Sequence, residues 1–181
     1  MANSCDITLS TIAQDCRPNL SGIKKIAVAN YVEGAFSKDD ANQNMVTLEH
    51  TEVKWTVYTP AKNTGSLTKT LTKNEQTGVL YYTNEVSATF NHMDGANGQA
   101  VDLLGQGRLM VVVQDKNEMN WVLGVDDWVS VSAITGQTGA AADDGNNWQI
   151  TFTEVSSHAA YNTATFVWDP ASSAGGGSSN P

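Results

Sequence analysis

The amino-acid sequence alternates between apolar and polar side chains most clearly in Gly78-Val79-Leu80-Tyr81-Tyr82-Thr83-Asn84-Glu85-Val86-Ser87-Ala88-Thr89-Phe90. One face of this run carries Leu80, Tyr82, Val86, Ala88 and Phe90, and the other carries Tyr81, Thr83, Glu85, Ser87 and Thr89. A period of two is typical of a β-strand that buries one face. The run therefore predicts a strand of about twelve residues, twice the usual length.

Two shorter alternating segments precede this strand. Val53-Lys54-Trp55-Thr56-Val57-Tyr58-Thr59 has a period of two and stops at Pro60, which cannot donate to a sheet. Ser66-Leu67-Thr68-Lys69-Thr70-Leu71-Thr72 has only Leu67 and Leu71 on its apolar side, and the turn-prone Lys73-Asn74-Glu75-Gln76-Thr77 follows it. We expect residues 66–90 to form a hairpin that is too long for one small core, and we interpret it as sheet shared between molecules.

The flanking sequence predicts the rest of the fold. Residues 1–22 are expected to form an extended arm, 23–32 a first strand, 33–44 a polar loop with Lys38-Asp39-Asp40 at its tip, and 45–49 a short strand. Residues 99–104 have helical spacing after a turn and before Gly105 and Gly107. Residues 108–114 are nearly all apolar, which predicts a central strand buried on both faces, with 120–125 as its hairpin partner.

The last third of the sequence predicts further strands at 128–134 and 148–154, separated by a loop at 136–147, and a final strand at 164–168. Residues 169–181 are rich in Ser and Gly and predict a flexible tail. The predicted fold is mainly β: an antiparallel β-sandwich or half-barrel with one short flanking helix, a long hairpin and extended arms. Residues 23–168 are expected to form one domain.

The composition excludes several classes of function. Nineteen acidic and ten basic residues give the 181-residue chain a formal charge of −9 at pH 7, which argues against a nucleic-acid-binding patch. The charge indicates a surface that repels its neighbours, or one that DNA passes without binding. No apolar stretch reaches the length of a membrane span and the first residues lack a signal peptide, so we expect a protein made in a cytoplasm.

Residues that could act in catalysis or bind a metal ion are scattered along the sequence. Cys5 and Cys16 are expected to be free thiols, with a disulfide clasp of the arm as the alternative. The histidines His50, His92 and His158 lack metal-ligand companions, and adjacent aspartates point to opposite faces of a strand or shape turns. Calcium at Asp143 and Asp144 stays an alternative, although the spacing is not that of an EF-hand. No catalytic, cofactor-binding or metal-binding residue is predicted.

The five tryptophans allow two interpretations. Trp55, Trp121 and Trp148 fall on apolar strand faces, which favours packing in the core. Trp128, Trp168 and Tyr161 are candidates for an exposed carbohydrate-binding surface. A carbohydrate-binding β-sandwich is therefore an alternative to an assembly protein, and an enzyme is the least favoured class.

The order of the predicted elements and several short sequence segments support a more specific hypothesis. The elements are Cys5-Asp6-Ile7-Thr8, a strand around Ile26, the hairpin ending in Val79-Leu80-Tyr81-Tyr82, a helix, Gly107-Arg108-Leu109-Met110-Val111-Val112-Val113-Gln114-Asp115, and Ile134-Thr135-Gly136 followed by Trp148-Gln149-Ile150-Thr151-Phe152-Thr153. Over about residues 4–160 this layout resembles the tail tube (major tail) proteins, virion proteins of tailed phages infecting Bacteroidota.

The resemblance implies a structural protein without catalytic residues. It implies a β-sandwich or half-barrel with one helix that assembles into homo-oligomeric rings, expected to be hexamers, which stack into a channel for DNA. The expected partners are other copies of the chain, other tail proteins and DNA that passes through the lumen without specific binding; no membrane partner is expected. The expected location is the virion tail, assembled in the host bacterial cytoplasm. Alternatives within the virion are a neck or tail-completion ring and a head decoration protein.

The long hairpin supplies the candidate contact residues. We expect Leu67, Leu71, Tyr81 and Tyr82 to lie in or near subunit contacts, because the hairpin is too long for one small core and because ring closure pairs edges that a lone domain must protect.

Overall fold

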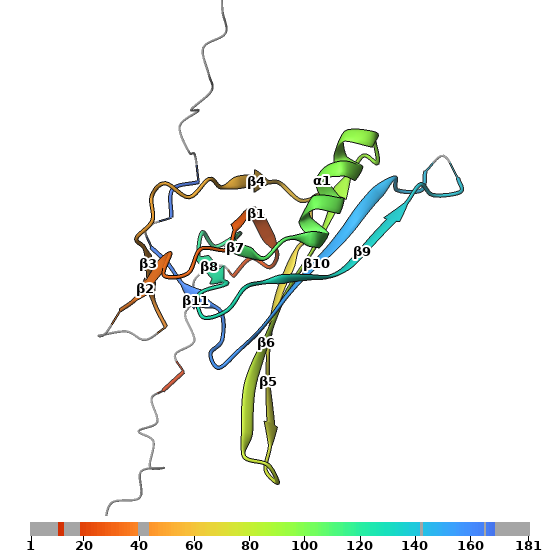
Figure 1. The fold of residues 1–181 in the computed structure, drawn as a ribbon. Helices are drawn as coiled ribbons and strands as arrows, with labels where there is room; N and C mark the ends of the chain where they lie inside the picture. Colours follow the sequence, from red (N-terminus) through yellow and green to blue (C-terminus); the bar gives the residue numbers. More distant parts are fainter. Residues whose placement is uncertain (1–10, 13–18, 40–43, 142, 165, 169–181) are drawn as a thin grey trace, which may run out of the picture.

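Three antiparallel sheets and one helix make up the computed structural model of the chain (Figure 1), which describes residues 11–12, 19–39, 44–141, 143–164 and 166–168. The five-stranded sheet has the order β11-β8-β7-β1-β4. Its strands are β1 (Ile23–Asn30), β4 (Thr56–Tyr58), β7 (Leu109–Asp115), β8 (Asn120–Leu123) and β11 (Tyr161–Asn162). The mainly β, antiparallel fold expected from the sequence is confirmed.

The four-stranded sheet contains the long hairpin. It has the order β5-β6-β10-β9, with β5 (Ser66–Asn74), β6 (Val79–Asn91), β9 (Ser130–Gln137) and β10 (Asn147–Ser156). A third sheet pairs β2 (Phe36–Lys38) with β3 (Val46–Leu48), and the helix α1 spans Gly95–Gln106. The long alternating strand and its hairpin partner are therefore present as expected, and β6 has 13 residues.

Two apolar clusters lie on opposite faces of the five-stranded sheet. The first cluster fills the space between the two large sheets, with Ile26 and Val111 from one sheet and Val86 and Phe152 from the other. The second cluster lies behind the five-stranded sheet, where Phe36 and Val46 of the small sheet cover it. Residues 109–113 of β7 are all buried because neighbours pack on both of their faces, which confirms the expected central strand.

The helix closes one end of the sandwich. Its N-cap Asp94 accepts a hydrogen bond from the Asn97 N–H (2.7 Å), which satisfies one of the free donors of the first turn. Val101 is its buried residue, and Leu104 packs against the first cluster. The helix begins earlier than the sequence indicated, at Gly95, because the cap at Asp94 allows residues 95–98 to join it. No helix among the described residues has the length and apolar content that crossing a membrane requires.

Three expectations for the secondary structure are wrong. The predicted loop at residues 33–44 contains β2. This strand is not apparent from the sequence because it has only three residues, two of which are exposed. The final strand predicted at 164–168 is absent from the described residues there; Phe166 packs on the second cluster through its ring instead. β9 extends to Gln137, so Gly136 lies in a strand and not in the loop. Cys5, Cys16, Asp40 and the predicted tail lie outside the described residues.

Candidate functional site

The hairpin of β5 and β6 projects away from the sandwich (Figure 1). β6 pairs with β5 along the whole of Ser66–Asn74. β10 accompanies β6 only as far as Tyr82, so the outer part of the hairpin has no third strand among the described residues. The outer hairpin must therefore be stabilised locally or by another molecule.

The tip of the hairpin has a tight turn. The Asn74 side chain accepts hydrogen bonds from the backbone N–H groups of Gln76 (3.0 Å) and Thr77 (3.3 Å). Gly78 has a φ of +69°, a left-handed conformation that costs glycine little. Asparagine and glycine thus fix the turn that the sequence predicted at this position.

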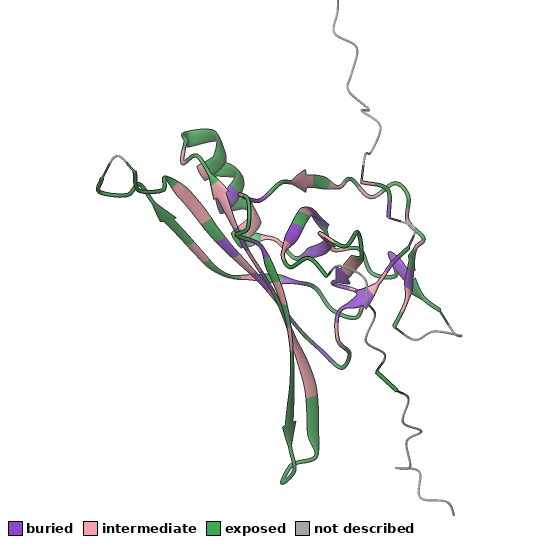
Figure 2. Ribbon diagram, turned by 180° about the vertical axis from the view of Figure 1, so that it is seen from behind, coloured by how far each residue is buried: buried purple, intermediate pink, exposed green. Residues whose placement is uncertain are grey.

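The core-facing side of the hairpin continues outward as an uncovered apolar strip. Leu67 packs against the first core cluster at the base of this side. Farther out, Leu71 lies opposite Tyr82 and Leu80 lies opposite Lys73. Leu71 is 49% exposed and Leu80 is 50% exposed, and Figure 2 shows this end of the hairpin as exposed. We call Leu71, Leu80 and Tyr82 the apolar strip.

The opposite side of the four-stranded sheet is polar. Its residues alternate with the buried ones and line up across the four strands in register. We call this side the hydroxyl face; it contains Ser66, Thr68, Thr70 and Thr72 of β5, Tyr81, Thr83, Glu85, Ser87 and Thr89 of β6, Gln149, Thr151, Thr153 and Val155 of β10, and Ser130, Ala133 and Thr135 of β9. Glu85 is the single charged residue of this set, and the set has no lysine or arginine.

Both edges of the four-stranded sheet end without a further strand in the described chain. β5 forms one edge and β9 forms the other. A free strand edge presents unpaired N–H and C=O groups that a strand of another molecule can pair with. The edge at β5 is nine residues long, longer than a usual strand.

The structure separates the four predicted contact residues. Leu71 and Tyr82 face each other in one row of the hairpin, on the apolar strip. Tyr81 points to the other side, on the hydroxyl face, opposite Thr72. Leu67 packs inside its own chain. Leu80, which the sequence analysis did not single out, extends the apolar strip toward the tip.

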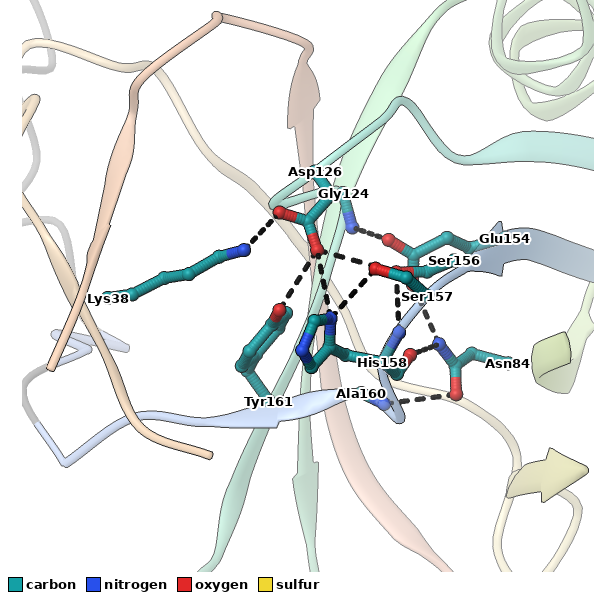
Figure 3. A network of polar contacts seen from close by, with 10 residues as sticks. All are labelled: Lys38, Asn84, Gly124, Asp126, Glu154, Ser156, Ser157, His158, Ala160 and Tyr161. Carbon is teal, nitrogen blue, oxygen red and sulfur yellow. Dashed lines mark hydrogen bonds and ion pairs between the residues drawn. The ribbon is translucent and has the colours of Figure 1, made fainter. Parts of the chain in front are cut away.

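A network of polar contacts lies where β6 and β10 leave the core (Figure 3). One part centres on Asp126, which pairs with the Lys38 ammonium at 2.5 Å and accepts a hydrogen bond from the Tyr161 hydroxyl at 2.9 Å. The other part joins two buried polar residues: the Asn84 Nδ2 donates to the Glu154 Oε2 at 2.9 Å, and the Glu154 Oε1 accepts from the Gly124 N–H at 2.9 Å. Asn84 is 0% and Glu154 is 3% exposed.

The environment shifts the pKa values of these groups in different directions. Burial raises the pKa of Glu154, and the hydrogen bonds from Gly124 and Asn84 offset only part of that effect. Burial also acts to raise the pKa of Asp126, but the hydrogen bonds from Lys38 and Tyr161 outweigh it and lower the pKa. The hydrogen bond to Asp126 raises the pKa of Lys38.

Ser157, His158 and Asp126 contain the residue types of a catalytic triad without its geometry. The Ser157 hydroxyl lies 2.8 Å from the His158 Nδ1, and the Asp126 Oδ2 lies 3.8 Å from the same nitrogen. A triad needs the serine and the aspartate on different ring nitrogens, so that one nitrogen takes the proton while the other is held. Both groups compete for one nitrogen here, and this cluster is better described as a hydrogen-bond network at the surface.

The aromatic residues considered for sugar binding do not form one exposed surface. Tyr161 is 3% exposed and packs in the second cluster. Trp168 packs against the same cluster and donates its Nε1–H to the Asn120 side chain at 2.8 Å. Trp128 is 41% exposed, and the Arg108 guanidinium lies 4.4 Å from its ring centre. Trp55, Trp121 and Trp148 pack against the clusters, as the sequence predicted.

The described residues contain no group of three or more His, Cys, Asp or Glu side chains that could hold a metal ion. The Asp144 carboxylate accepts hydrogen bonds from the N–H groups of Ala140 and Ala141, each at 2.7 Å, which gives it the role of a turn-shaping residue.

Comparison with known protein families, curated proteins and solved structures finds no match to this chain.

Proposed function

We propose that the chain is a structural, non-enzymatic subunit of a phage virion, and specifically a tail tube protein that closes into homo-oligomeric rings. The observation that carries this proposal is the projecting hairpin with its uncovered apolar strip. Exposed Leu71 and Leu80 gain about 25 cal/mol for each Å² of apolar surface that a neighbour covers. The strip thus has a physical reason to be in contact with a second copy.

The strand edges support closure into a ring. β5 and β9 are the two ends of one sheet, so a heterologous contact can place β5 of one copy beside β9 of the next. Such head-to-tail contacts generate a ring when the rotation closes. In a closed ring every one of these edges is paired, and the subunits share one continuous sheet.

The hydroxyl face supports a channel for DNA. Phosphate binding needs lysine or arginine, and the hydroxyl face has neither. Its threonine and serine side chains give a wettable wall with few fixed charges, and Glu85 adds a negative one. We place this face toward the lumen of the ring, where DNA passes without being held, and the apolar strip toward a neighbouring subunit.

The assembly state of the purified full-length chain tests the proposal. We expect rings or tubes by negative-stain electron microscopy and a multimeric mass by light scattering at high protein concentration. Stacked tubes support the tail tube role, single rings favour a neck or tail-completion ring, and monomers that bind to heads favour a decoration protein. A chain that remains monomeric and binds no virion part contradicts the whole class.

Leu71→Asp tests the apolar strip, and Thr70→Asp is its matched control. The two residues are neighbours on β5, both are exposed, and they point to opposite sides of the hairpin. We expect Leu71→Asp to give monomers with an unchanged circular dichroism spectrum, and Thr70→Asp to assemble like the natural chain. Equal assembly of both variants would place the subunit contact elsewhere.

A further inference from the structure

Lys69, Asn84 and Glu154 stand in one row across three neighbouring strands. The register places Lys69 of β5 opposite Asn84 of β6, and Asn84 opposite Glu154 of β10. Directly opposite residues of an antiparallel pair have Cβ atoms about 5 Å apart on the same face. The adjacent row is apolar and belongs to the first cluster, so this polar row lies at the margin of the core.

The Asn84 carboxamide is fully buried, and its partners fix its orientation. The Nδ2 donates to the Glu154 Oε2 (2.9 Å) and to the His158 carbonyl (3.3 Å), and the Oδ1 accepts from the Ala160 N–H (3.0 Å). Exchanging the oxygen and nitrogen would set the amide nitrogen against the Ala160 N–H and the amide oxygen against the His158 carbonyl. The carbonyl carbon therefore has a hydrogen-bond donor at its oxygen and a carboxyl group beside its nitrogen.

The Lys69 amine approaches the same residue, Ala160, from the neighbouring strand. Its Nζ donates to the Ala160 carbonyl at 3.1 Å and lies 3.3 Å from the centre of the Trp121 ring. No carboxylate of the described residues lies within ion-pair distance of it. Burial lowers the pKa of Lys69 to about 8. A desolvated amine with a lowered pKa is a nucleophile near neutral pH.

We propose that Lys69 and Asn84 join in an intramolecular isopeptide bond, with Glu154 as the proton carrier and the Ala160 N–H as the donor to the carbonyl oxygen. The arrangement has the parts that acyl transfer needs: a nucleophile, an acyl carbon, a donor where negative charge develops, and an acid at the leaving nitrogen. This inference is independent of the proposed assembly into rings.

The reaction balances without a further reactant. The electron pair of the neutral Lys69 Nζ forms a bond to the Asn84 Cγ, and the negative charge that develops on Oδ1 is held by the Ala160 N–H. Once the Nζ–Cγ bond has formed, Nζ and Nδ2 are bonded to the same carbon, and one proton passes from Nζ to Nδ2 through the Glu154 carboxyl group, which contacts Nδ2. The Cγ–Nδ2 bond then breaks with its electron pair on nitrogen, the carbonyl reforms, and ammonia leaves.

The surroundings suit both the reaction and its product. The Glu154 Oε2 lies 2.9 Å from the leaving nitrogen, and burial raises the pKa of this carboxyl group, which favours its role as a proton carrier. Lys69 lines two cavities of about 720 and 830 Å³, which give ammonia a route to solvent. The new bond ties the edge strand β5 to β6 at the base of the projecting hairpin, where β5 has a partner strand on one side only among the described residues.

Mass spectrometry of the purified full-length chain tests the proposal. We expect the denatured chain to be lighter than its sequence by one ammonia. Cleavage after Glu52, Glu75 and Glu85 separates residues 53–75 from 76–85 in an unlinked chain, whereas a bond between Lys69 and Asn84 holds the two fragments together. Cyclisation of Asn84 alone loses the same ammonia but leaves the fragments separate, and that result would overturn the proposal.

Variants assign the roles. Lys69→Arg removes the nucleophile and Glu154→Gln removes the proton carrier, so we expect both to show the full sequence mass and separate fragments. Lys73→Arg, on the same side of the same strand but near the tip, is the matched control and should keep the bond. A natural chain that retains its full mass after long incubation at mildly alkaline pH overturns the proposal, whether or not any variant folds. A linked fragment pair in Lys69→Arg would do the same.

Discussion

Gly136 of β9 lies directly against the indole ring of Trp148, its register partner on β10. A Cβ atom added to Gly136 would lie 2.5 Å from the Cζ3 of Trp148 and 3.0 Å from the Met93 methyl group. Trp148 in turn packs against the first core cluster. The absence of a side chain at Gly136 therefore leaves room for the indole ring of Trp148.

Gly136→Ala should destabilise the protein by about 1 to 3 kcal/mol, because the ring of Trp148 must move out of a packed position. Urea unfolding followed by tryptophan fluorescence measures the change. Gly95→Ala is the matched control, since nothing lies within 4 Å of its added Cβ and alanine favours the helix that begins there. An equal loss in both variants would contradict the close packing at Trp148.

Asp126→Asn should remove part of the acid sensitivity of the fold. The folded-state pKa of Asp126 is lowered, so its contribution to stability is present above the unfolded-state pKa and is lost as the pH falls through the folded-state pKa. We expect the free energy of unfolding of the natural chain to fall more steeply with acid than that of Asp126→Asn. Asp102→Asn on the exposed face of α1 serves as the control and should follow the natural chain.

Glu154→Ala should cost about 2 to 4 kcal/mol, because it leaves the Gly124 N–H and one of the two Asn84 Nδ2 hydrogens buried without an acceptor. The comparison is made in a Lys69→Arg background, where no isopeptide bond contributes. Val155→Ala, at the adjacent and 58% exposed position, should change the free energy of unfolding by less than about 0.5 kcal/mol. Similar losses for both variants would show that the buried network adds little to stability.

Lysine on the hydroxyl face should create DNA binding that the natural chain lacks. We expect Thr151→Lys with Thr153→Lys to retard duplex DNA in a gel-shift assay at low salt, with the effect lost as salt rises. Leu103→Lys with Val167→Lys adds the same charge at exposed positions away from this face. Strong retardation by the natural chain, or equal retardation by the two lysine variants, would contradict a face that lets DNA pass.

The alternation of the sequence predicted most of the sheet because each large strand buries one face or two. Val86 and Ala88 repeat at a period of two, and residues 109–113 are buried throughout. Where strands are short, tertiary packing decides. β2 forms because Phe36 reaches the second cluster, and Phe166 reaches the same cluster without joining a sheet.

The polar network was harder to predict because its members are far apart in the sequence. One signal was present: Asn84 interrupts the apolar face of β6 between Tyr82 and Val86, and Glu154 follows Phe152 on the apolar face of β10. Polar residues at core positions need partners. Which partners they find depends on the register of three strands, and that register was set by packing of the whole sheet and not by any local pattern.

β6 is one uninterrupted strand from the tip of the hairpin to the entrance of α1. At about 3.4 Å for each residue its 13 residues span about 44 Å, and β10 accompanies it only from Asn91 to Tyr82. The strand has no break between its outer end at Val79 and its inner end at Asn91. In the proposed ring, a neighbour that contacts Leu80 would touch the same continuous strand that ends at Asn91, three residues before the cap of α1, so the strand would link contacts at the two ends of the subunit.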